Sequence, residues 1–435
     1  MPVSTSKALR VAVIADSDTR WKWGALTARR LSERDAGLSG FLLRGRATPT
    51  PRQLAEVGAG VDPDTIREVT GAEFVRAMEQ DPPDVVVLAL VGGAVQAMLH
   101  GLASLSRRPV VVTGYVGVVY EKLADGLLLR HGADVVLANS RHDAERFRAV
   151  YEGVGADASA VTETALPFLG GAPYAPADGR DTVVFAAQPS VPESREGRSY
   201  LLRRLVGHAR LHPAREVLLK LRSKPGEHTT HIEELPYQKM AERLPGGLPP
   251  NFRLVYGHMG DVLDRADLLV TVSSTAALES LHRSIPTAIL TDLGIREALG
   301  NHHFIGSGCL ASWDQLDAGE RPRADPHWLA RQGVAAGGPP SGGGSYESAF
   351  DAVRARVGHL LDRPGLPPIA PYYTPVTAPG YLPGILARHR LDAAPATEVT
   401  GVRRVVRDAV RDAARGAYRH GVQRVVPVIR RMGEL

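Results

Sequence analysis

The chain has 435 residues, of which 44% are hydrophobic and 23% charged, a composition typical of globular proteins and a length sufficient for two domains. Its single cysteine, Cys309, excludes an intramolecular disulfide framework and fits a reducing compartment. No apolar run approaches the roughly 20 residues of a membrane-spanning helix. No secretory signal precedes the first strand, so we expect a cytoplasmic protein.

The net charge of +5 is unevenly distributed. Residues 401–435 hold nine arginines against three acidic residues, a net of +6, which leaves −1 for the rest of the chain. A nearly neutral main body is not the surface of a nucleic-acid-binding protein, and we expect no nucleic-acid partner.

The first part of the chain alternates continuous apolar runs with helical patterns, which indicates a parallel sheet covered on both faces. Strands are predicted at 10–16, 39–45, 83–90, 109–114 and 133–140. Helices are predicted at 23–34, 70–80, 94–105 and 141–154.

The second part repeats this pattern after a segment rich in proline and glycine. Strands are predicted at 182–188, 216–222, 252–257, 267–272 and 286–291. Helices are predicted at 199–212, 261–266, 275–283 and 346–361. The sequence thus predicts an α/β protein with two Rossmann-like, doubly wound domains facing a cleft, where the carboxyl ends of the strands bind ligands. The expected organisation is a first domain at 1–168, a linker at 169–181, a second domain at 182–395 and a tail at 396–435.

The segment 268–281 joins an apolar strand to an alanine-rich helix through three hydroxyl residues, Ser273, Ser274 and Thr275. Hydroxyls and free N–H groups at such a turn suit a phosphate, and Glu279, about one turn into the helix, suits ribose hydroxyls. The alternative is an ordinary helix cap.

Three cations follow the strand at 216–222, namely Lys220, Arg222 and Lys224. Because residues at alternate positions share one face of a strand, these side chains are expected to converge on the same ligand. Arginine in particular suits planar, bidentate contacts to a phosphate. We include Gly257, at the end of the next strand, in this predicted donor site; the alternative is a solvated basic turn.

The loop after the first strand contains an Asp-x-Asp pattern formed by Asp16 and Asp18. Asp16 is a catalytic candidate, whereas Asp18 and Lys22 are assigned to acceptor binding, with a structural role as the alternative. Trp21 and Trp23 either line a sugar site or pack a helix against the sheet.

A second dense loop of the first domain begins at the carboxyl end of the strand 109–114. We assign Gly114, Tyr115 and Gly117 to acceptor binding. Glu121 and Asp125 follow, and either carboxylate is a candidate general base for an acceptor hydroxyl, a role worth about 10² to 10⁴ in rate. A solvent-facing turn is the alternative for Asp125.

Histidines occur at His228 and His231 and again at His302 and His303, without a second cysteine or a carboxylate cluster. This pattern is too weak for a metal site, so we predict no metal and no cofactor apart from a nucleotide-sugar co-substrate.

These residues together resemble an actinobacterial family of GT-B-type glycosyltransferases grouped under a domain of unknown function. The matching strings span roughly residues 10–310: ADSDTRWKW, GYVGVVYEKLADG, FAAQPSVP, KLRSKPGEHTTH, YGHMGDVLDRADLLVTVSSTAALES and NHHFIGSG. The resemblance implies a GT-B fold and transfer of a sugar from a nucleotide donor.

A looser similarity extends to bacterial polysialyltransferases, Kdo transferases and CDP-glycerol polymerases. Ala124-Asp125-Gly126 partly matches the acidic motif with the general base of those enzymes, and Ser273-Ser274 matches their paired serines. Arg222 stands where they have a histidine beside the phosphate. Since arginine holds its proton, it can neutralise a departing phosphate but cannot act as an acid.

Residues 401–435 place valine and alanine on one helical stripe and arginine on the other face. Such a basic amphipathic helix fits an anionic membrane surface, which predicts a peripheral position on the inner face of the cell membrane. A helix packed on the body or a disordered tail is the alternative.

The favoured function is an inverting glycosyltransferase that moves a sugar, such as a nonulosonic or Kdo-like acid from a CMP-sugar, to a cell-wall or surface glycopolymer or lipid-linked acceptor. Alternatives are a CDP-alcohol glycerol- or ribitol-phosphate transferase of teichoic-acid type and a non-catalytic polyanion-binding scaffold. A sugar-nucleotide epimerase is a further alternative, although the Ser-Gly-Gly turn usual in those enzymes is absent. Fold alone does not decide among these alternatives.

Overall fold

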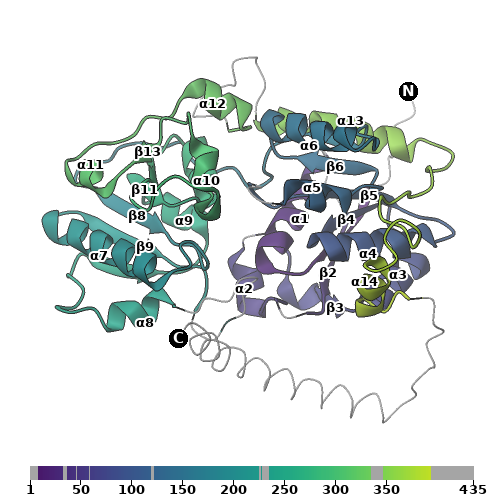
Figure 1. The fold of residues 1–435 in the computed structure, drawn as a ribbon, viewed down its shortest axis with the longest axis horizontal. Coiled ribbons are helices and arrows are strands. Elements are labelled where there is room, and N and C mark those ends of the chain that lie inside the picture. Colours follow the sequence, from purple (N-terminus) through teal and green to yellow (C-terminus); the bar gives the residue numbers. More distant parts are fainter. Residues whose placement is uncertain are drawn as a thin grey trace, which may run out of the picture.

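The computed structural model describes most of the chain. The described residues are 8–32, 37–45, 47–57, 59–118, 122–224, 227, 235–334 and 346–392. Two separate parallel sheets lie side by side, one in each half of the molecule (Figure 1).

The first sheet has seven parallel strands in the order β3-β2-β1-β4-β5-β6-β7. The strands are β1 (Arg10–Ala15), β2 (Gly37–Leu43), β3 (Arg67–Val69), β4 (Val85–Ala89), β5 (Val110–Gly114), β6 (Val135–Ala138) and β7 (Val161–Glu163). Their central members are wholly buried because helices cover both faces. The strand order reverses between β1 and β4, and the carboxyl ends of strands at such a reversal form a ligand-binding crevice.

Helices connect the parallel strands of this domain. They are α1 (Asp18–Arg30), α2 (Pro51–Glu56), η1 (Pro63–Thr65), α3 (Gly71–Gln80), α4 (Gly92–Ala103), α5 (Leu123–Leu128) and α6 (Arg141–Gly153). Two hydrophobic clusters lie on opposite faces of the sheet, one reached by Ile14 and Leu88 and the other by Val13 and Val87.

Helix α1 begins five residues earlier than the sequence pattern predicts. The Ser17 hydroxyl accepts a hydrogen bond from the backbone of Arg20 and so caps the helix at Asp18. Trp21 and Trp23 are 1% and 0% exposed and pack helix against sheet, so they do not line a sugar site. Asp18 therefore lies on a rigid helical turn and not in a loop.

The second sheet has six parallel strands in the order β10-β9-β8-β11-β12-β13. The strands are β8 (Thr182–Ala186), β9 (Glu216–Lys220), β10 (Phe252–Val255), β11 (Leu268–Thr271), β12 (Thr287–Leu290) and β13 (Leu310–Ala311). Its helices are α7 (Arg195–Leu211), α8 (Tyr237–Glu242), α9 (Met259–Leu263), α10 (Ala276–His282), η2 (Glu297–Leu299), η3 (Asn301–Phe304), α11 (Trp313–Asp317) and α12 (Pro326–Arg331). Here the order reverses between β8 and β11.

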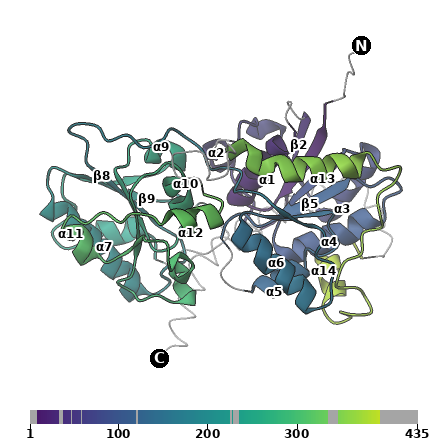
Figure 2. The ribbon, with the colours of Figure 1, turned by 90° about the horizontal axis from the view of Figure 1, so that it is seen from above.

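The end of the described chain returns to the first domain, which differs from the predicted second domain of 182–395. It contains η4 (Tyr346–Phe350), α13 (Asp351–Leu361) and α14 (Leu382–Arg388). Phe350 and Val353 belong to the hydrophobic cluster of the first sheet, and Figure 2 shows α13 lying across that domain. The physical reason is an apolar face of the first sheet that α1 alone leaves uncovered.

The α/β fold class predicted from the sequence is confirmed, with two Rossmann-like parallel sheets in a GT-B-like arrangement. Within the part of the chain that the model describes, no helix has the length and apolarity needed to cross a membrane. The predicted tail at 396–435 lies outside the described residues.

Candidate active site

A cleft of about 710 Å³ lies between the two domains. Its second-domain wall is formed by the residues that follow β8, β9 and β11, which meet at the point where the strand order reverses. The first turn of α1, residues of α2, Val116 and Phe168 form the opposite wall. The geometry is that of a ligand site between two doubly wound domains.

Lys220 lies at the base of this cleft, where β9 ends. Its side chain is buried, and Nζ donates a hydrogen bond to the carbonyl oxygen of Leu221 at 2.7 Å. Burial lowers the pKa of Lys220 to about 8, because a charged ammonium group loses its hydration there. A bound anion would restore a favourable partner for that charge.

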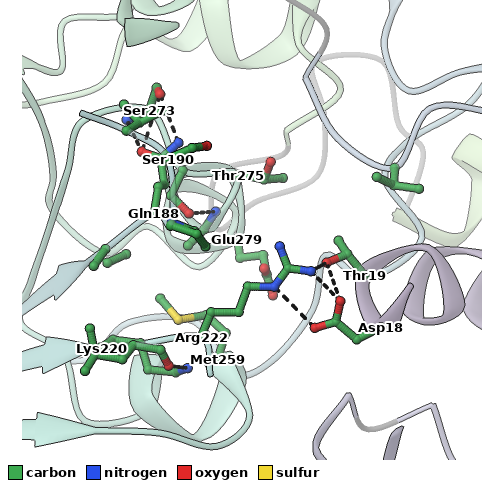
Figure 3. Close-up of a pocket in the computed structure, with 18 of the residues that line it drawn as sticks. Asp18, Thr19, Gln188, Ser190, Lys220, Arg222, Met259, Ser273, Thr275 and Glu279 are labelled. Carbon is green, nitrogen blue, oxygen red and sulfur yellow. Dashed lines mark hydrogen bonds and ion pairs between the residues drawn. The ribbon is translucent and has the colours of Figure 1, made fainter. Parts of the chain in front are cut away.

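Arg222 extends from the same strand end across the cleft to α1 (Figure 3). Its Nε donates to Asp18 Oδ2 at 3.2 Å, and its Nη2 donates to Asp18 Oδ1 and Thr19 Oγ1. Burial alone would raise the pKa of Asp18. The charge and hydrogen bonds of Arg222, with bonds from Thr19, outweigh burial and lower that pKa below its usual value.

A second ion pair crosses the cleft beside the first. Lys22 Nζ, on α1, lies 3.3 Å from Glu279 Oε2, on α10, and both side chains are at most 14% exposed. The same ammonium lies 4.6 Å from the centre of the Phe168 ring. The predicted donor residue Glu279 and the predicted acceptor residue Lys22 are therefore brought together.

The hydroxyl turn after β11 lines the cleft as predicted, but its serines already have internal partners. Ser273 Oγ donates to the carbonyl oxygen of Leu299 at 2.5 Å, and Gln188 Oε1 accepts from the Ser273 backbone at 3.0 Å. Ser274 Oγ accepts from the backbone of Ala276 at 3.2 Å. The Ser273 hydroxyl is therefore buried and connects two other loops, and its assignment to the donor site stays a prediction.

Thr275 and Gly257 also line the cleft. A Cβ atom on Gly117 would lie 2.8 Å from Thr275 Oγ1, so this glycine allows a close approach of the two domains. Gly117 thus packs closely against the second domain, and its assignment to acceptor binding stays a prediction.

Three further residues assigned to the acceptor side or to catalysis have structural roles. Asp16 accepts hydrogen bonds from Arg20 at 2.8 Å and from the backbone of Val91 at 3.0 Å, which ties α1 to the start of α4. A Cβ on Gly114 would lie 2.8 Å from Trp23, so that glycine is needed for packing. The Arg130 guanidinium carbon lies 4.0 Å from the centre of the Tyr115 ring, so this tyrosine packs against the arginine. Asp16, Gly114 and Tyr115 are not among the residues that line the cleft.

Of the two predicted general bases, the structure describes only Asp125, which is not among the residues lining the cleft. Asp125 is exposed on α5. Burial raises the pKa of Tyr373, and the negative charge of Asp125 raises it further. Glu121 lies outside the described residues. Lys224 is exposed; its backbone N–H donates to the Glu227 carboxylate at 2.8 Å, and its carbonyl oxygen accepts from the Glu227 backbone at 3.2 Å. Asp125 thus lies outside the cleft lining, and its assignment as the general base stays a prediction without support from its position.

The loop after β8 contributes residues that the sequence analysis did not single out. Gln188, Ser190 and Glu193 line the cleft beside the hydroxyl turn. Their position in the sequence could have identified them, because residues that directly follow a central strand of a parallel sheet often bind ligands. Glu56 of α2 and Glu297 of η2 carry no comparable sequence signal.

Among the described residues, one cluster has metal-ligating side chains, His208, His212 and Asp317. Two of its three side chains already have cationic partners, since Arg215 lies 2.8 Å from His208 Nε2 and Arg204 lies 3.0 Å from Asp317. None of the three residues lines the cleft, and the cluster fits a structural role. His228 and His231 lie outside the described residues.

The fold and cleft define a protein of GT-B-like architecture, and solved structures share it at low identity. UDP-GlcNAc 2-epimerase from Neisseria meningitidis, bound to UDP-GlcNAc, matches with a TM-score of 0.52 and 11% identity over 82% of this chain and 100% of that one. The S. aureus MnaA–UDP complex matches with a TM-score of 0.53 and 10% identity over 82% and 99%. At these identities the likeness shows the fold alone. No curated protein matches the chain significantly.

The chain belongs to the family described as "Putative glycosyltransferase (DUF6716)", whose model matches residues 11–341. This range contains both sheets and both walls of the cleft. The family resemblance that the sequence indicates is thus confirmed at the level of a GT-B-like glycosyltransferase family.

Proposed function

We propose that the protein transfers a sugar from a nucleotide-sugar donor to an acceptor hydroxyl in the cleft between its domains. The observation that carries this proposal is the pair Lys220 and Arg222, two cations held at one strand end inside a 710 Å³ cleft. That volume lies in the range of small-molecule sites, roughly 300–1,000 Å³. Two similar structures are named as complexes with UDP or UDP-GlcNAc, which further supports a nucleotide-sugar.

The cationic and anionic side chains of the cleft suit two different parts of a nucleotide donor. Lys220 and Arg222 would neutralise the phosphate, and Glu279 would accept hydrogen bonds from ribose hydroxyls after separating from Lys22. Ser274 and Thr275 line the space between these groups. The sugar would then project towards α1 and the first domain.

In an inverting transfer, the acceptor oxygen attacks the anomeric carbon while the nucleotide phosphate leaves from the opposite side. The leaving oxygen gains negative charge, and preorganised cations stabilise such charge better than water does. Lys220 and Arg222 are the groups suited to this task. A carboxylate on the first-domain wall would take the acceptor proton.

A nucleotide panel tests this proposal. CMP, UDP, CDP-glycerol and UDP-GlcNAc would be added to the full chain in thermal unfolding and calorimetry. A ligand at 100 times its Kd stabilises the folded state by about 2.7 kcal/mol, so a clear rise in Tm is expected for the cognate nucleotide. Ser274→Ala should reduce this rise, whereas Ser159→Ala, at an exposed site of the first domain, should not.

The responding nucleotide decides among the alternatives. Stabilisation by CMP supports the CMP-sugar donor that the sequence resemblance favours, and stabilisation by UDP moves the donor to a UDP-sugar. A response confined to CDP-glycerol indicates alcohol-phosphate transfer. Conversion of UDP-GlcNAc to its 2-epimer without an acceptor would identify an epimerase. No response to any nucleotide would refute the proposed transferase activity.

The arginine-rich sequence 401–435 supports a membrane-bound acceptor. We expect residues 401–435 to bind vesicles with anionic headgroups, since each cation near such a surface contributes about 1 kcal/mol. Truncation after residue 400 should abolish cosedimentation with phosphatidylglycerol vesicles and leave nucleotide binding intact. Neutral phosphatidylcholine vesicles are the control. Equal binding by the truncated protein would exclude this role of the tail.

A further inference from the structure

The first turn of α1 lies across the cleft from Arg222 of the second domain and binds its guanidinium group. Asp18 and Thr19, from α1, receive every hydrogen bond drawn from Arg222 in Figure 3. One turn later Lys22 pairs with Glu279. The two ion pairs therefore connect the same helix to the two groups assigned to the donor phosphate and ribose.

The edge of Arg222 that Asp18 occupies is the edge that a phosphate needs. Nε and Nη2 form the guanidinium fork that binds two oxygens of a carboxylate or phosphate in one plane. Both donate to the two oxygens of Asp18. Since one fork cannot hold both anions in this geometry, a donor phosphate must compete with Asp18.

Asp18 stays in the cleft when it loses Arg222, because it is held on a capped helix. Its side chain is 13% exposed, and Ser17 fixes the start of α1. The other first-domain carboxylate of the cleft, Glu56, is already paired with Arg52 on the same helix. Asp18 is thus the carboxylate whose partner is removed at the moment the donor arrives.

We propose that the donor phosphate displaces Asp18 from Arg222 and that the freed Asp18 carboxylate is the general base of the transfer. This inference rests on the proposed function. The acceptor hydroxyl proton passes to Asp18 Oδ while the acceptor oxygen forms a bond to the anomeric carbon. The bond from that carbon to the phosphate oxygen breaks, and its electron pair stays on the nucleotide, beside Arg222 and Lys220.

The exchange has a physical consequence for the strength of the base. While Arg222 is bound, its positive charge favours the ionised form of Asp18 and opposes proton uptake. When a phosphate neutralises Arg222, the effect of burial remains and increases the proton affinity of the carboxylate. The base therefore gains strength after the donor binds, which predicts that the donor binds before the acceptor.

The Asp18→Asn variant distinguishes this proposal from a purely structural role of Asp18. The proposal predicts tighter nucleotide binding together with slower donor hydrolysis. A neutral amide is a weaker partner for Arg222, so the phosphate competes more easily and nucleotide Kd should fall about tenfold. The amide cannot take a proton, so nucleotide release from a hydrolysed donor should slow by about 10² to 10⁴. A merely structural pair would give weaker binding together with slower release.

The measurements use the full chain with CMP and UDP as binding probes and CMP-N-acetylneuraminate and UDP-GlcNAc as hydrolysed donors. Glu79→Gln makes the same chemical change at an exposed site on α3 and should behave as wild type. If the wild type binds neither nucleotide, the proposed function fails. If it binds and Asp18→Asn binds equally or more weakly, the exchange is refuted. If Asp18→Asn binds nucleotide more tightly but releases it from the hydrolysed donor at the wild-type rate, Asp18 is not the general base.

Discussion

Arg222→Ala is expected to weaken nucleotide binding by about 10² to 10⁴, because hydrogen bonds to charged groups are worth about 1.5–3 kcal/mol each and a phosphate would lose two of them. Arg222→Lys should lie between this variant and the wild type, since lysine keeps the charge but not the planar fork. Isothermal titration calorimetry with the nucleotide that stabilises the wild type measures both.

Arg253→Ala is the matched control for Arg222. Arg253 lies on the neighbouring strand β10, its side chain is 67% exposed, and it forms a long ion pair of 3.8 Å with Glu216. Removing it changes the charge of the same domain by the same amount without touching the cleft, so its nucleotide Kd should equal that of the wild type. Unchanged binding in Arg222→Ala would exclude the phosphate from this strand end.

The Arg222 and Asp18 variants together form the sharper test. They remove opposite partners of one ion pair, and a pair that only held the domains together would give effects of the same direction. The proposed exchange instead predicts weaker binding without Arg222 and tighter binding without the Asp18 charge. The double variant shows whether the gain from Asp18→Asn requires Arg222.

Lys220→Met is expected to make the ligand-free protein more stable at pH 7 and to remove nucleotide binding. Burial lowers the pKa of Lys220 to about 8 from an unfolded value of 10.5. Such a shift corresponds to a folding penalty of up to about 3 kcal/mol. Methionine fills a similar volume without charge, although it loses the hydrogen bond to Leu221.

The pH dependence of this gain follows from the direction of the shift. Below pH 8 both folded and unfolded chains carry the lysine proton, so the penalty is present in full. Between pH 8 and pH 10.5 only the unfolded chain holds the proton, and the penalty declines as pH rises. The gain of Lys220→Met should therefore be largest at neutral pH and disappear near pH 10.5.

Chemical denaturation at pH 7 and pH 10.5 measures this difference. Lys239→Met, at an exposed position of α8, is the control and should change the free energy of unfolding by no more than about 0.5 kcal/mol. Lower stability of Lys220→Met at pH 7, or an equal gain at both pH values, would contradict the account. A stable variant that still bound nucleotide would show that this cation is not used for the donor.

The strands and the edge of the sheet that lines the cleft could be predicted from sequence patterns. Continuous apolar runs such as 83–90 report burial on both faces, and polar residues that follow them mark the strand ends. For this reason Lys220 and Arg222 were placed correctly at the cleft. The start of α1 was missed because Trp21 and Lys22 obscure the helical period, while the cap at Ser17 is a single hydrogen bond.

The internal partners of the site could not be predicted. The Ser273 hydroxyl is used by Gln188, 85 residues away, and by Leu299. A Ser-Ser-Thr turn has the same sequence whether its hydroxyls bind a ligand or another loop. Asp125 belongs to a partial motif match but is exposed on α5, because similarity of a short string does not determine the direction of a side chain.

The sequence by itself determined the class of fold, the family and the kind of residue at each strand end, since these depend on local periodicity and on near neighbours. Only the tertiary structure decided which charges meet. Asp18 and Arg222 are 204 residues apart and pair because two independently formed sheets place their carboxyl ends against one cleft. The return of 346–392 to the first domain has the same cause, an uncovered apolar face that no local pattern reveals.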